Sequence, residues 1–561
     1  MSALSSNSKY YKEAFNLFKQ CSKNDDRQDL ANKIFDEASS TTSDTLKITK
    51  SCSRELEQLL PYVTSISILS TFFNRLTQDH LDELIRDRSA CFVLEKIFIY
   101  LPNALSSDNE QQQIRSAFNR LFQCVCENFD DYIQDTGSSH IIASVIAFLH
   151  PLLPSNDNND YERLIDGGRT AKQFVSLSSE WNVIEKLPQI SKLVKQNTNY
   201  NEFVYATLLR TCGYLRRKLY EKLVKRLCSK HYPELNLEHL LDKRSSFIFE
   251  VLVEFPSNER EEKIYPIVWE NIDEIYLHPI GNFFLQHLLL SLNDEELIEK
   301  VYQLLTDKER FEKLTQQAHI RLLITFIRIC ERFHCHYEEL INRLNRTINP
   351  KNNTNDFIPC LLKLRSGKEF FSSFLTKHFE IFVENPAENE TITKDGTLVI
   401  QALLRAERID VQTRQSFLSL TGEQIASIAC NPSGSHLLCQ LILKSPLWPI
   451  LRQNNFYNKL DQVYTKMACD KSGCWFVTQL WKNAITIEQK LQMAKSLSED
   501  FSTLRSHIYA KFITYEMNLN AYCSRPDQWK RSIEIVLKKH ALLEDLDEDN
   551  QKKKRKKKKM K

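Results

Sequence analysis

Apolar and polar residues follow a helical period through most of the chain, and residues 277–290, LHPIGNFFLQHLLL, show the pattern clearly. On a helix with about 100° per residue, the paired apolar side chains of this segment share one face that must be buried. Asn282 and Gln286 stand one turn apart, and Phe283 lies beside them, away from that face. Two amides can hydrogen-bond the edge of a flat polar ligand while the ring stacks on it.

The same arrangement recurs along the chain: a small residue, then three candidate binding positions, then apolar pairs. The small residue falls at 52, 90, 138, 245, 281, 396, 434, 473 and 505, mostly at intervals of 32–39 residues. The first, second and fifth residues after it occupy these positions: Ser53, Arg54 and Glu57; Cys91, Phe92 and Glu95; Ser139, His140 and Ala143; Ser246, Phe247 and Glu250; Asn282, Phe283 and Gln286; Thr397, Leu398 and Gln401; Ser435, His436 and Cys439; Cys474, Trp475 and Thr478; and Ser506, His507 and Ala510. All of them except Ala143, Leu398, Cys439, Thr478 and Ala510 make up the candidate site.

The two long gaps have room for degenerate units, and NTNYNEFVYATLL and QQAHIRLLITFI are candidates, which makes about eleven units. Each predicted unit is a helical hairpin with one apolar face, which only stacking can bury, so the sequence predicts an all-α curved solenoid. Four of the ten glycines occupy the small-residue position, where a Cβ would obstruct a tight turn against a neighbouring helix. Several units carry Asp or Asn three residues earlier, as a helix cap.

Composition and charge add three constraints. A chain of 561 residues with 42% hydrophobic and 26% charged residues has the composition of a folded protein, and its length favours several domains or a repeat array. The 15 scattered cysteines and a polar N-terminal segment predict reduced thiols, and no apolar run is long enough to span a membrane. Residues 552–561 hold nine basic side chains, so subtracting nine from the net charge of +3 leaves −6 for residues 1–551. Any nucleic-acid site within residues 1–551 must therefore be a local basic face.

No pattern in the sequence favours an enzyme, a cofactor or a metal site. GxGxxG, GxxxxGKS and HExxH motifs are absent. Cys330 and His334 share a helix face in CERFHCHYEEL, but no second ligand pair accompanies them, so we predict no zinc site. Taken singly, each candidate unit is better explained as a solvated helix face, and an aromatic residue could pack between units. Leu398 favours packing. The recurrence at a fixed offset favours binding.

The repeated frame resembles the Pumilio (PUF) RNA-binding repeat. In that family the first and fifth residues of a five-residue motif contact a base edge, and the second stacks on the base. NFFLQ, residues 282–286, matches the uracil-type pattern, whereas SRELE, 53–57, and SFIFE, 246–250, match the guanine-type pattern. Landmarks such as LHPIGNFFLQHLL, NPSGSHLLCQLI and DKSGCWFVTQLW, with degenerate motif positions and a lysine-rich tail, resemble the nucleolar Pumilio-like family called nucleolar protein nine.

The resemblance implies a right-handed, C-shaped solenoid of Pumilio/armadillo-like repeats and a non-catalytic protein that binds precursor ribosomal RNA. It further implies a role in small-subunit ribosomal RNA processing, a nuclear and nucleolar location, pre-ribosomal particle proteins as partners, and a monomer. The alternatives are a Pumilio-like regulator of messenger RNA and an armadillo- or HEAT-like protein-binding scaffold. We expect repeats over 1–540, with a lead-in over about 1–30 and insertions at about 151–195 and 345–390. A disordered tail over 541–561 would be a nuclear localisation signal, an RNA anchor or both.

Overall fold

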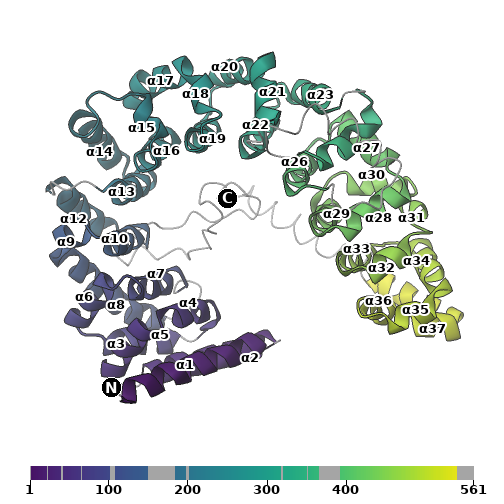
Figure 1. Cartoon of the computed structure of the whole chain (residues 1–561), viewed down its shortest axis with the longest axis horizontal. Helices are drawn as coiled ribbons and strands as arrows, with labels where there is room; N and C mark the ends of the chain where they lie inside the picture. Colours follow the sequence, from purple (N-terminus) through teal and green to yellow (C-terminus); the bar gives the residue numbers. More distant parts are fainter. Residues whose placement is uncertain are drawn as a thin grey trace, which may run out of the picture. The chain divides into compact units, whose positions relative to one another are not determined.

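The computed structural model describes residues 2–539 except for 22, 40–41, 65, 101–107, 149–182, 197–200, 317–319, 350–351 and 365–391. Every regular element of this part is a helix, as the periodicity predicts (Figure 1). The chain divides into two compact units, Met1–Asn271 and Ile272–Lys561. The predicted tail, 541–561, lies outside the described residues. No helix of the described part is both long and apolar enough to cross a membrane.

The predicted motif segments form one layer of helices, in which neighbours along the sequence pack side by side within each unit (Figure 1). We call these the motif helices. In the first unit they are α4 (Ser53–Leu59), α7 (Ala90–Tyr100), α10 (Thr136–Phe148), α13 (Glu202–Leu215) and α16 (Ser246–Glu254). In the second unit they are α19 (Gly281–Ser291), α22 (Ile320–Arg332), α26 (Lys394–Arg405), α29 (Pro432–Lys444), α33 (Lys471–Lys482) and α36 (Ala510–Glu516).

Most motif helices are accompanied by two kinds of helix, so the repeat is larger than the expected two-helix hairpin; for α13 no leading helix is described. Short leading helices precede the motif helices: α3 (Thr42–Ser51), α6 (Gln78–Arg86), α9 (Phe129–Tyr132), α15 (Leu237–Leu241), α18 (Ile272–Ile275), α21 (Lys308–Gln316), α24 (Phe357–Leu362), α28 (Gly422–Cys430), α32 (Tyr464–Cys469) and α35 (Phe501–Ser506). Trailing helices follow: α5 (Ile66–Arg75), α8 (Asp108–Glu127), α12 (Val183–Gln196), α14 (Arg217–Lys230), α17 (Tyr265–Glu270), α20 (Glu295–Leu305), α23 (Tyr337–Ile348), α27 (Val411–Ser419), α30 (Trp448–Gln453), α31 (Phe456–Lys459), α34 (Ile487–Glu499) and α37 (Leu519–Ser524).

A few further elements lie outside this scheme. Helices α1 (Ser2–Gln20) and α2 (Asn24–Ala38) precede the first repeat, and residues 526–539 are helical after the last. Three short segments have other helical geometry: η1 (Leu60–Tyr62), η4 (Arg260–Ile264) and η5 (Thr354–Asp356). Helix α12 lies within the range where we expected an insertion, and it serves as the trailing helix of the third repeat.

Most motif helices begin at a turn organised by one capping side chain, as the sequence predicts; α4 has no such cap. Asp470 accepts hydrogen bonds from the backbone N–H groups of Ser472 (2.7 Å) and Gly473 (2.8 Å), and Asn431 bonds the N–H groups of Ser433 and Gly434 in the same way. Backbone N–H donors at the same place lower the pKa values of Asp135 and Asp242. Such caps satisfy amide groups that have no partner inside the helix.

Glycine at the small-residue position allows the backbones of the leading and motif helices to approach closely. A Cβ at Gly473 would lie 2.5 Å from the carbonyl oxygen of Met467, and one at Gly434 would collide with the carbonyl oxygen of Ile428. Distances of that kind are not tolerated between backbone and Cβ atoms. The predicted reason for glycine is therefore confirmed at these two positions.

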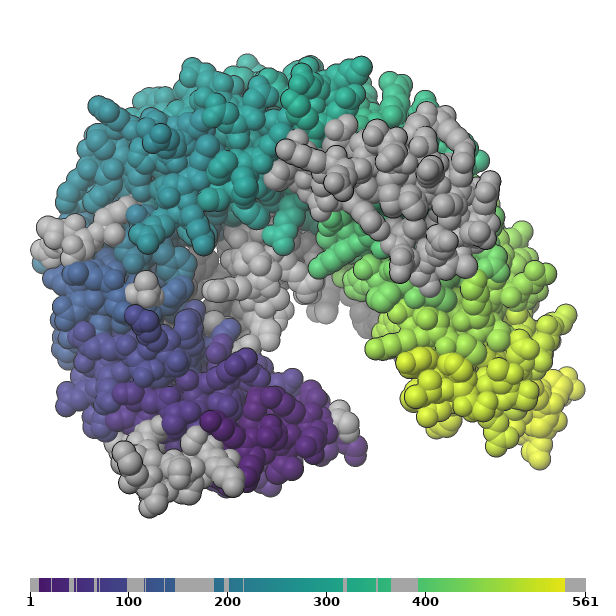
Figure 2. All heavy atoms as spheres, viewed as in Figure 1, coloured from purple at the N-terminus to yellow at the C-terminus, as the bar shows by residue number. Residues whose placement is uncertain are grey.

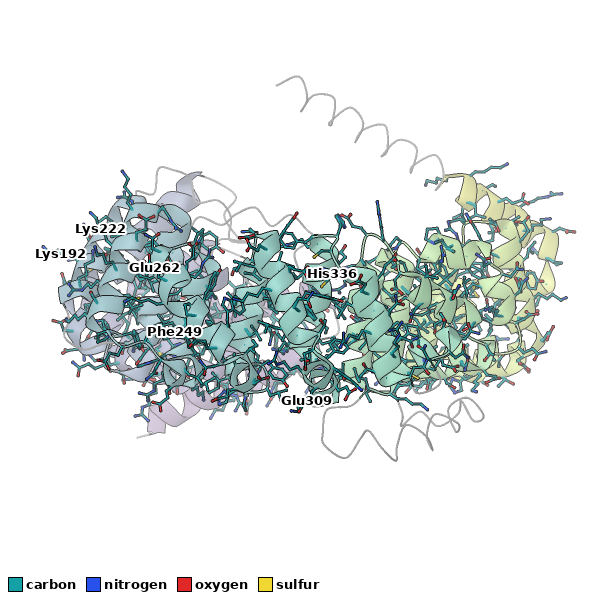
Figure 3. All side chains as sticks on the ribbon, turned by 90° about the horizontal axis from the view of Figure 1, so that it is seen from above. Lys192, Lys222, Phe249, Glu262, Glu309 and His336 are labelled. Carbon is teal, nitrogen blue, oxygen red and sulfur yellow. The ribbon has the colours of Figure 1, made fainter. Side chains whose placement is uncertain are left out.

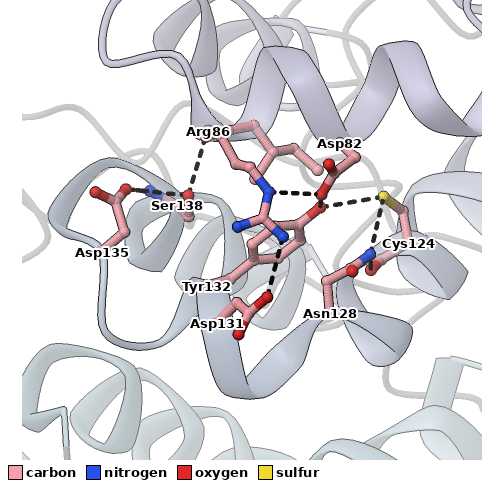
Figure 4. Close-up of polar contacts among 9 residues, drawn as sticks. Asp82, Arg86, Cys124, Asn128, Asp131, Tyr132, Asp135 and Ser138 are labelled. Atoms are coloured by element: carbon pink, nitrogen blue, oxygen red, sulfur yellow. Dashed lines mark hydrogen bonds and ion pairs between the residues drawn. The ribbon is translucent and has the colours of Figure 1, made fainter.

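Successive repeats are joined by polar bonds as well as by their apolar cores. Figure 4 shows one such junction, in which the Tyr132 hydroxyl donates to Asp82 (2.5 Å) and Arg86 bonds both Asp82 (2.9 Å) and Asp131 (3.2 Å). Ser138 donates to the carbonyl oxygen of Ile85 (3.0 Å), which fixes the start of α10 against α6. Side chains fill the space between the helices of each unit (Figure 2).

Cationic side chains also bridge neighbouring trailing and motif helices. The Arg120 guanidinium on α8 donates to the carbonyl oxygen of Phe73 on α5 (3.2 Å), and Arg332 on α22 donates to that of Leu290 on α19 (3.2 Å). Each cation thus caps carbonyl groups at the C-terminal end of a helix in the preceding repeat, where positive charge is favourable. These bonds hold α8 against α5 and α22 against α19.

Candidate nucleic-acid interface

Within each of the two units, the second motif positions form a row of largely exposed side chains on neighbouring motif helices. Trp475 is 60% exposed and Phe283 42%, whereas the residues that follow each of them are fully buried. The second-position residues at the predicted sites are Arg54, Phe92, His140, Phe247, Phe283, Leu398, His436 and Trp475. Flat rings and guanidinium groups of this kind are stacking platforms for bases.

Two motif helices that sequence analysis only suggested add members to this row. Phe203 on α13 is exposed, and its ring centroid lies 4.9 Å from that of His140, which itself lies 6.2 Å from Phe92. Arg321 is the exposed residue at the corresponding place on α22. The sequence frame does not place Phe203 in this row, because it stands two residues after the cap Asn201, whereas Trp475 stands five residues after the cap Asp470. The ring contact with His140 places it there.

First and fifth positions differ from the second, because most are buried and already hydrogen-bonded. Asn282 and Gln286 are only 6% and 5% exposed. Gln286 donates to the Asn282 side-chain oxygen (2.9 Å), and Asn282 donates to the backbone oxygens of His278 (2.7 Å) and Pro279 (2.9 Å). The two amides lie together as predicted, but a ligand must compete with these bonds.

Several other first-position side chains hold neighbouring parts of the structure together. Ser435 donates to the carbonyl oxygen of Ser472 (2.8 Å), and the Cys474 thiol donates to that of Tyr509 (3.4 Å), so each links its motif helix to the next repeat. Thr397 bonds the carbonyl oxygen of Lys394 (2.7 Å) within its own helix. Of the remaining predicted positions, Ser53, Cys91, Ser139, Ala143, Ser246, Gln401 and Cys439 are buried, whereas Glu57, Glu95 and Thr478 are half-buried.

The expected frame of the last unit is wrong by five residues. Ser506 ends the leading helix α35, and the His507 Nδ1 atom accepts from the N–H group of Tyr509 (3.4 Å), which is the capping role of Asp470. The motif helix begins only at Ala510, so Ala510 takes the small-residue position. Lys511, Phe512 and Tyr515 then occupy the first, second and fifth positions, and all three are exposed.

The match to a family model decides the family. A model described as the NOP9-like PUF repeat domain matches residues 188–512, from within α12 to within α36. The chain belongs to the NOP9-like PUF repeat family.

Relatives and solved structures agree with this assignment. Nucleolar protein 9 of Schizosaccharomyces pombe is 22% identical over 520 residues, covering 85% of this chain and 75% of that protein. Nucleolar protein 9 of Mus musculus is 24% identical over 55% of this chain, which spans about half (49%) of that relative. The solved structure of APUM23-GGAAUUGACGG has a TM-score of 0.57 at 17% identity, covering 94% of this chain and 99% of that one, and so shares the fold.

Glu250, at the fifth position of α16, is a buried acidic residue with a shifted pKa. It is 8% exposed, and burial raises the pKa of its carboxyl group to about 7, with Arg210 opposing and Glu254 reinforcing the change. Arg210 is itself bonded to Glu254 (2.9 Å), which also accepts from the Tyr214 hydroxyl (2.5 Å). Near neutral pH this fifth position can therefore be either a neutral acid or a carboxylate.

In the histidine and cysteine cluster at 330–336, His336 is bound by two glutamates and a tyrosine ring and Cys330 is buried. His336 bonds Glu299 (2.5 Å) on α20 and Glu339 (2.9 Å) on α23, its ring stacks 4.1 Å from that of Tyr302, and its pKa is raised, first by the bond to Glu339. Cys330 is buried, and burial raises its pKa. Within the residues described, no group of three or more His, Cys, Asp or Glu side chains is arranged to hold a metal ion.

Proposed function

We propose that this chain is a nucleolar RNA-binding protein that binds precursor ribosomal RNA through its row of second-position side chains. The observation that carries the proposal is this row, in which Phe92, His140 and Phe203 follow one another on α7, α10 and α13, and Trp475 and Phe512 occupy α33 and α36. Exposed rings on consecutive helices can each stack on one base of a single strand. The relatives named Nucleolar protein 9 support the nucleolar location.

The finer role proposed is support of small-subunit ribosomal RNA processing without catalysis, as a monomer among pre-ribosomal particle proteins. The sequence in APUM23-GGAAUUGACGG contains uridine and is therefore RNA, which supports single-stranded RNA as the ligand class. Buried first and fifth positions imply that bases are held mainly by stacking, with edge contacts where a side chain can exchange its present bond for one to the base. The lysine-rich segment 552–561 would add a nonspecific anchor and a nuclear localisation signal.

The direct test compares the affinity of full-length variants for a panel of 11-nucleotide RNAs that includes GGAAUUGACGG. Trp475→Ala should weaken binding by about 1–3 kcal/mol, the usual contribution of a stacked base. Gln286→Ala should cost a similar amount for an RNA with uracil opposite α19. Ile485→Ala, which removes a 52% exposed side chain outside the motif positions, is the matched control and should leave affinity unchanged.

Two outcomes would favour the other functions. If neither Trp475→Ala nor Gln286→Ala changes affinity for any RNA, and complexes isolated with the chain survive RNase, a protein-binding scaffold is the better description. If RNA binds as expected but the tagged chain stays in the cytoplasm, a regulator of messenger RNA is favoured.

A further inference from the structure

The outer face of trailing helices α12 and α14 carries an unusual concentration of positive charge. Residues 216–230, RRKLYEKLVKRLCSK, contain seven basic residues and one acidic residue, whereas residues 1–551 as a whole carry a net charge of −6. We define the α12–α14 basic surface by five exposed lysines: Lys192, Lys218, Lys222, Lys225 and Lys230.

The two helices bring these charges together in space. The Arg226 guanidinium on α14 donates to the carbonyl oxygen of Lys195 on α12 (2.5 Å). The pKa of Lys195 is lowered by burial and then by the positive charges of Arg226 and Lys222. Figure 3 draws Lys192 and Lys222 close together at one edge of the view. The basic residues of α12 and α14 therefore form one surface, and they repel each other.

Among the residues that the structure describes, none of the five lysines forms an ion pair with a carboxylate. The one acidic residue of α14, Glu221, is bonded to Arg217 (3.1 Å). By contrast, lysines on two leading helices are paired: Lys50 on α3 with Glu83 (2.7 Å) and Lys466 on α32 with Glu423 (2.8 Å). Folding alone does not require this charge, because α14 is held by buried apolar residues such as Leu223 and Leu227. Uncompensated positive charge is instead suited to an anionic partner.

The α12–α14 basic surface lies on trailing helices, on the other side of the first unit from motif helices α10 and α13 (Figure 1). We propose that it binds the phosphate backbone of an RNA segment that flanks the segment held by the motif row. This inference rests on the proposed function and adds to it a second, sequence-independent contact on a different face.

The chemistry of the surface favours RNA over an acidic protein. Protein interfaces usually have an apolar and aromatic centre and are depleted in lysine. Between residues 216 and 230 the apolar side chains are buried or half-buried, and the exposed positions are mostly lysines. Mobile ammonium groups spread over about three helical turns can follow a phosphate backbone without a fixed geometry.

The test uses the full-length chain and two RNAs: the 11-mer GGAAUUGACGG, and a 40-nucleotide RNA with that sequence at its centre. In the surface variant, Lys192, Lys218, Lys222 and Lys225 are replaced by glutamine. In the matched control, four exposed lysines that are far apart in the sequence, Lys33, Lys308, Lys495 and Lys530, are replaced by glutamine, so both variants lose four positive charges. Affinity is measured between 50 and 200 mM salt, with the basic tail present in every protein.

We expect the surface variant to bind the 40-mer more weakly, with a slope of log affinity against log salt that is smaller by up to about 3, from roughly 0.7 for each lost phosphate contact. A loss of that size makes the affinity change between the two salt concentrations about 50-fold smaller. Binding of the 11-mer should not change, because it reports on the motif row. Wild-type binding of the 40-mer by the surface variant, or an equal loss in the control, would overturn the proposal. Failure of the 11-mer to bind any of the proteins would instead count against the motif row alone.

Discussion

Replacing Glu250 by glutamine should stabilise the helix α16 at pH 8 and have little effect at pH 5. The carboxyl group is 8% exposed, and its pKa in the folded protein is about 7 compared with an ordinary value of 4.5. A raised pKa means that the folded state binds the proton more tightly than the unfolded state. Stability is therefore greatest below pH 4.5, falls as the pH rises to about 7, and changes no further above it.

The expected magnitude follows from the two pKa values. At about 1.36 kcal/mol for each pH unit, the ionised Glu250 side chain costs less than about 1 kcal/mol at pH 5 and roughly 3 kcal/mol at pH 8. Glutamine has nearly the same shape and no charge, so it removes this pH-dependent cost. The stability difference between the variant and the wild type should therefore grow by roughly 2 kcal/mol between the two pH values.

Hydrogen exchange measured by mass spectrometry on peptides covering residues 246–254 is the suitable assay, because it reports local stability in a large repeat protein. At pH 8 these amides should exchange up to about 100-fold more slowly in Glu250→Gln than in the wild type, and at pH 5 the rates should be similar. Glu254→Gln is the control with the opposite sign, because it removes the ion pair with Arg210 and leaves one acceptor oxygen where Arg210 and Tyr214 now use two, so it should speed exchange. Equal effects of Glu250→Gln at both pH values would refute the raised pKa.

Three further variants test other parts of the structure. Gly434→Ala should lower the free energy of unfolding by about 1–3 kcal/mol, measured in urea, because its Cβ would collide with the carbonyl oxygen of Ile428; no loss would show that the helices can move apart. Phe512→Ala should weaken RNA binding without a change in thermal stability, whereas His507→Ala should speed hydrogen exchange in α36 because His507 caps this helix. If His507→Ala weakens RNA binding and Phe512→Ala does not, His507 is the binding residue of this repeat. Tyr132→Phe should cost about 1–3 kcal/mol in thermal unfolding, because it removes the buried hydroxyl that donates to Asp82; an unchanged melting temperature would argue against the junction in Figure 4.

The sequence alone determined the positions of most motif helices. Caps such as Asp470 and glycines such as Gly473 act over a few residues, and the apolar period of a helix is visible within about two turns. Short-range signals of this kind were sufficient to place eight of the nine predicted motifs on motif helices. They failed at the last unit, because a histidine cap at His507 was not distinguished from a motif residue.

The tertiary structure decided which side chains are available for binding and where charge accumulates. Whether Ser435 is free depends on a carbonyl group at Ser472, 37 residues away, and whether Glu250 is ionised depends on burial by neighbouring helices. The four lysines of α14 in the α12–α14 basic surface are visible in the sequence, but Lys192 joins them because α12 packs against α14, where Arg226 bonds the carbonyl oxygen of Lys195. Contacts between residues some 30 to 40 positions apart have no signature in the local pattern, so only the packed repeats can specify them.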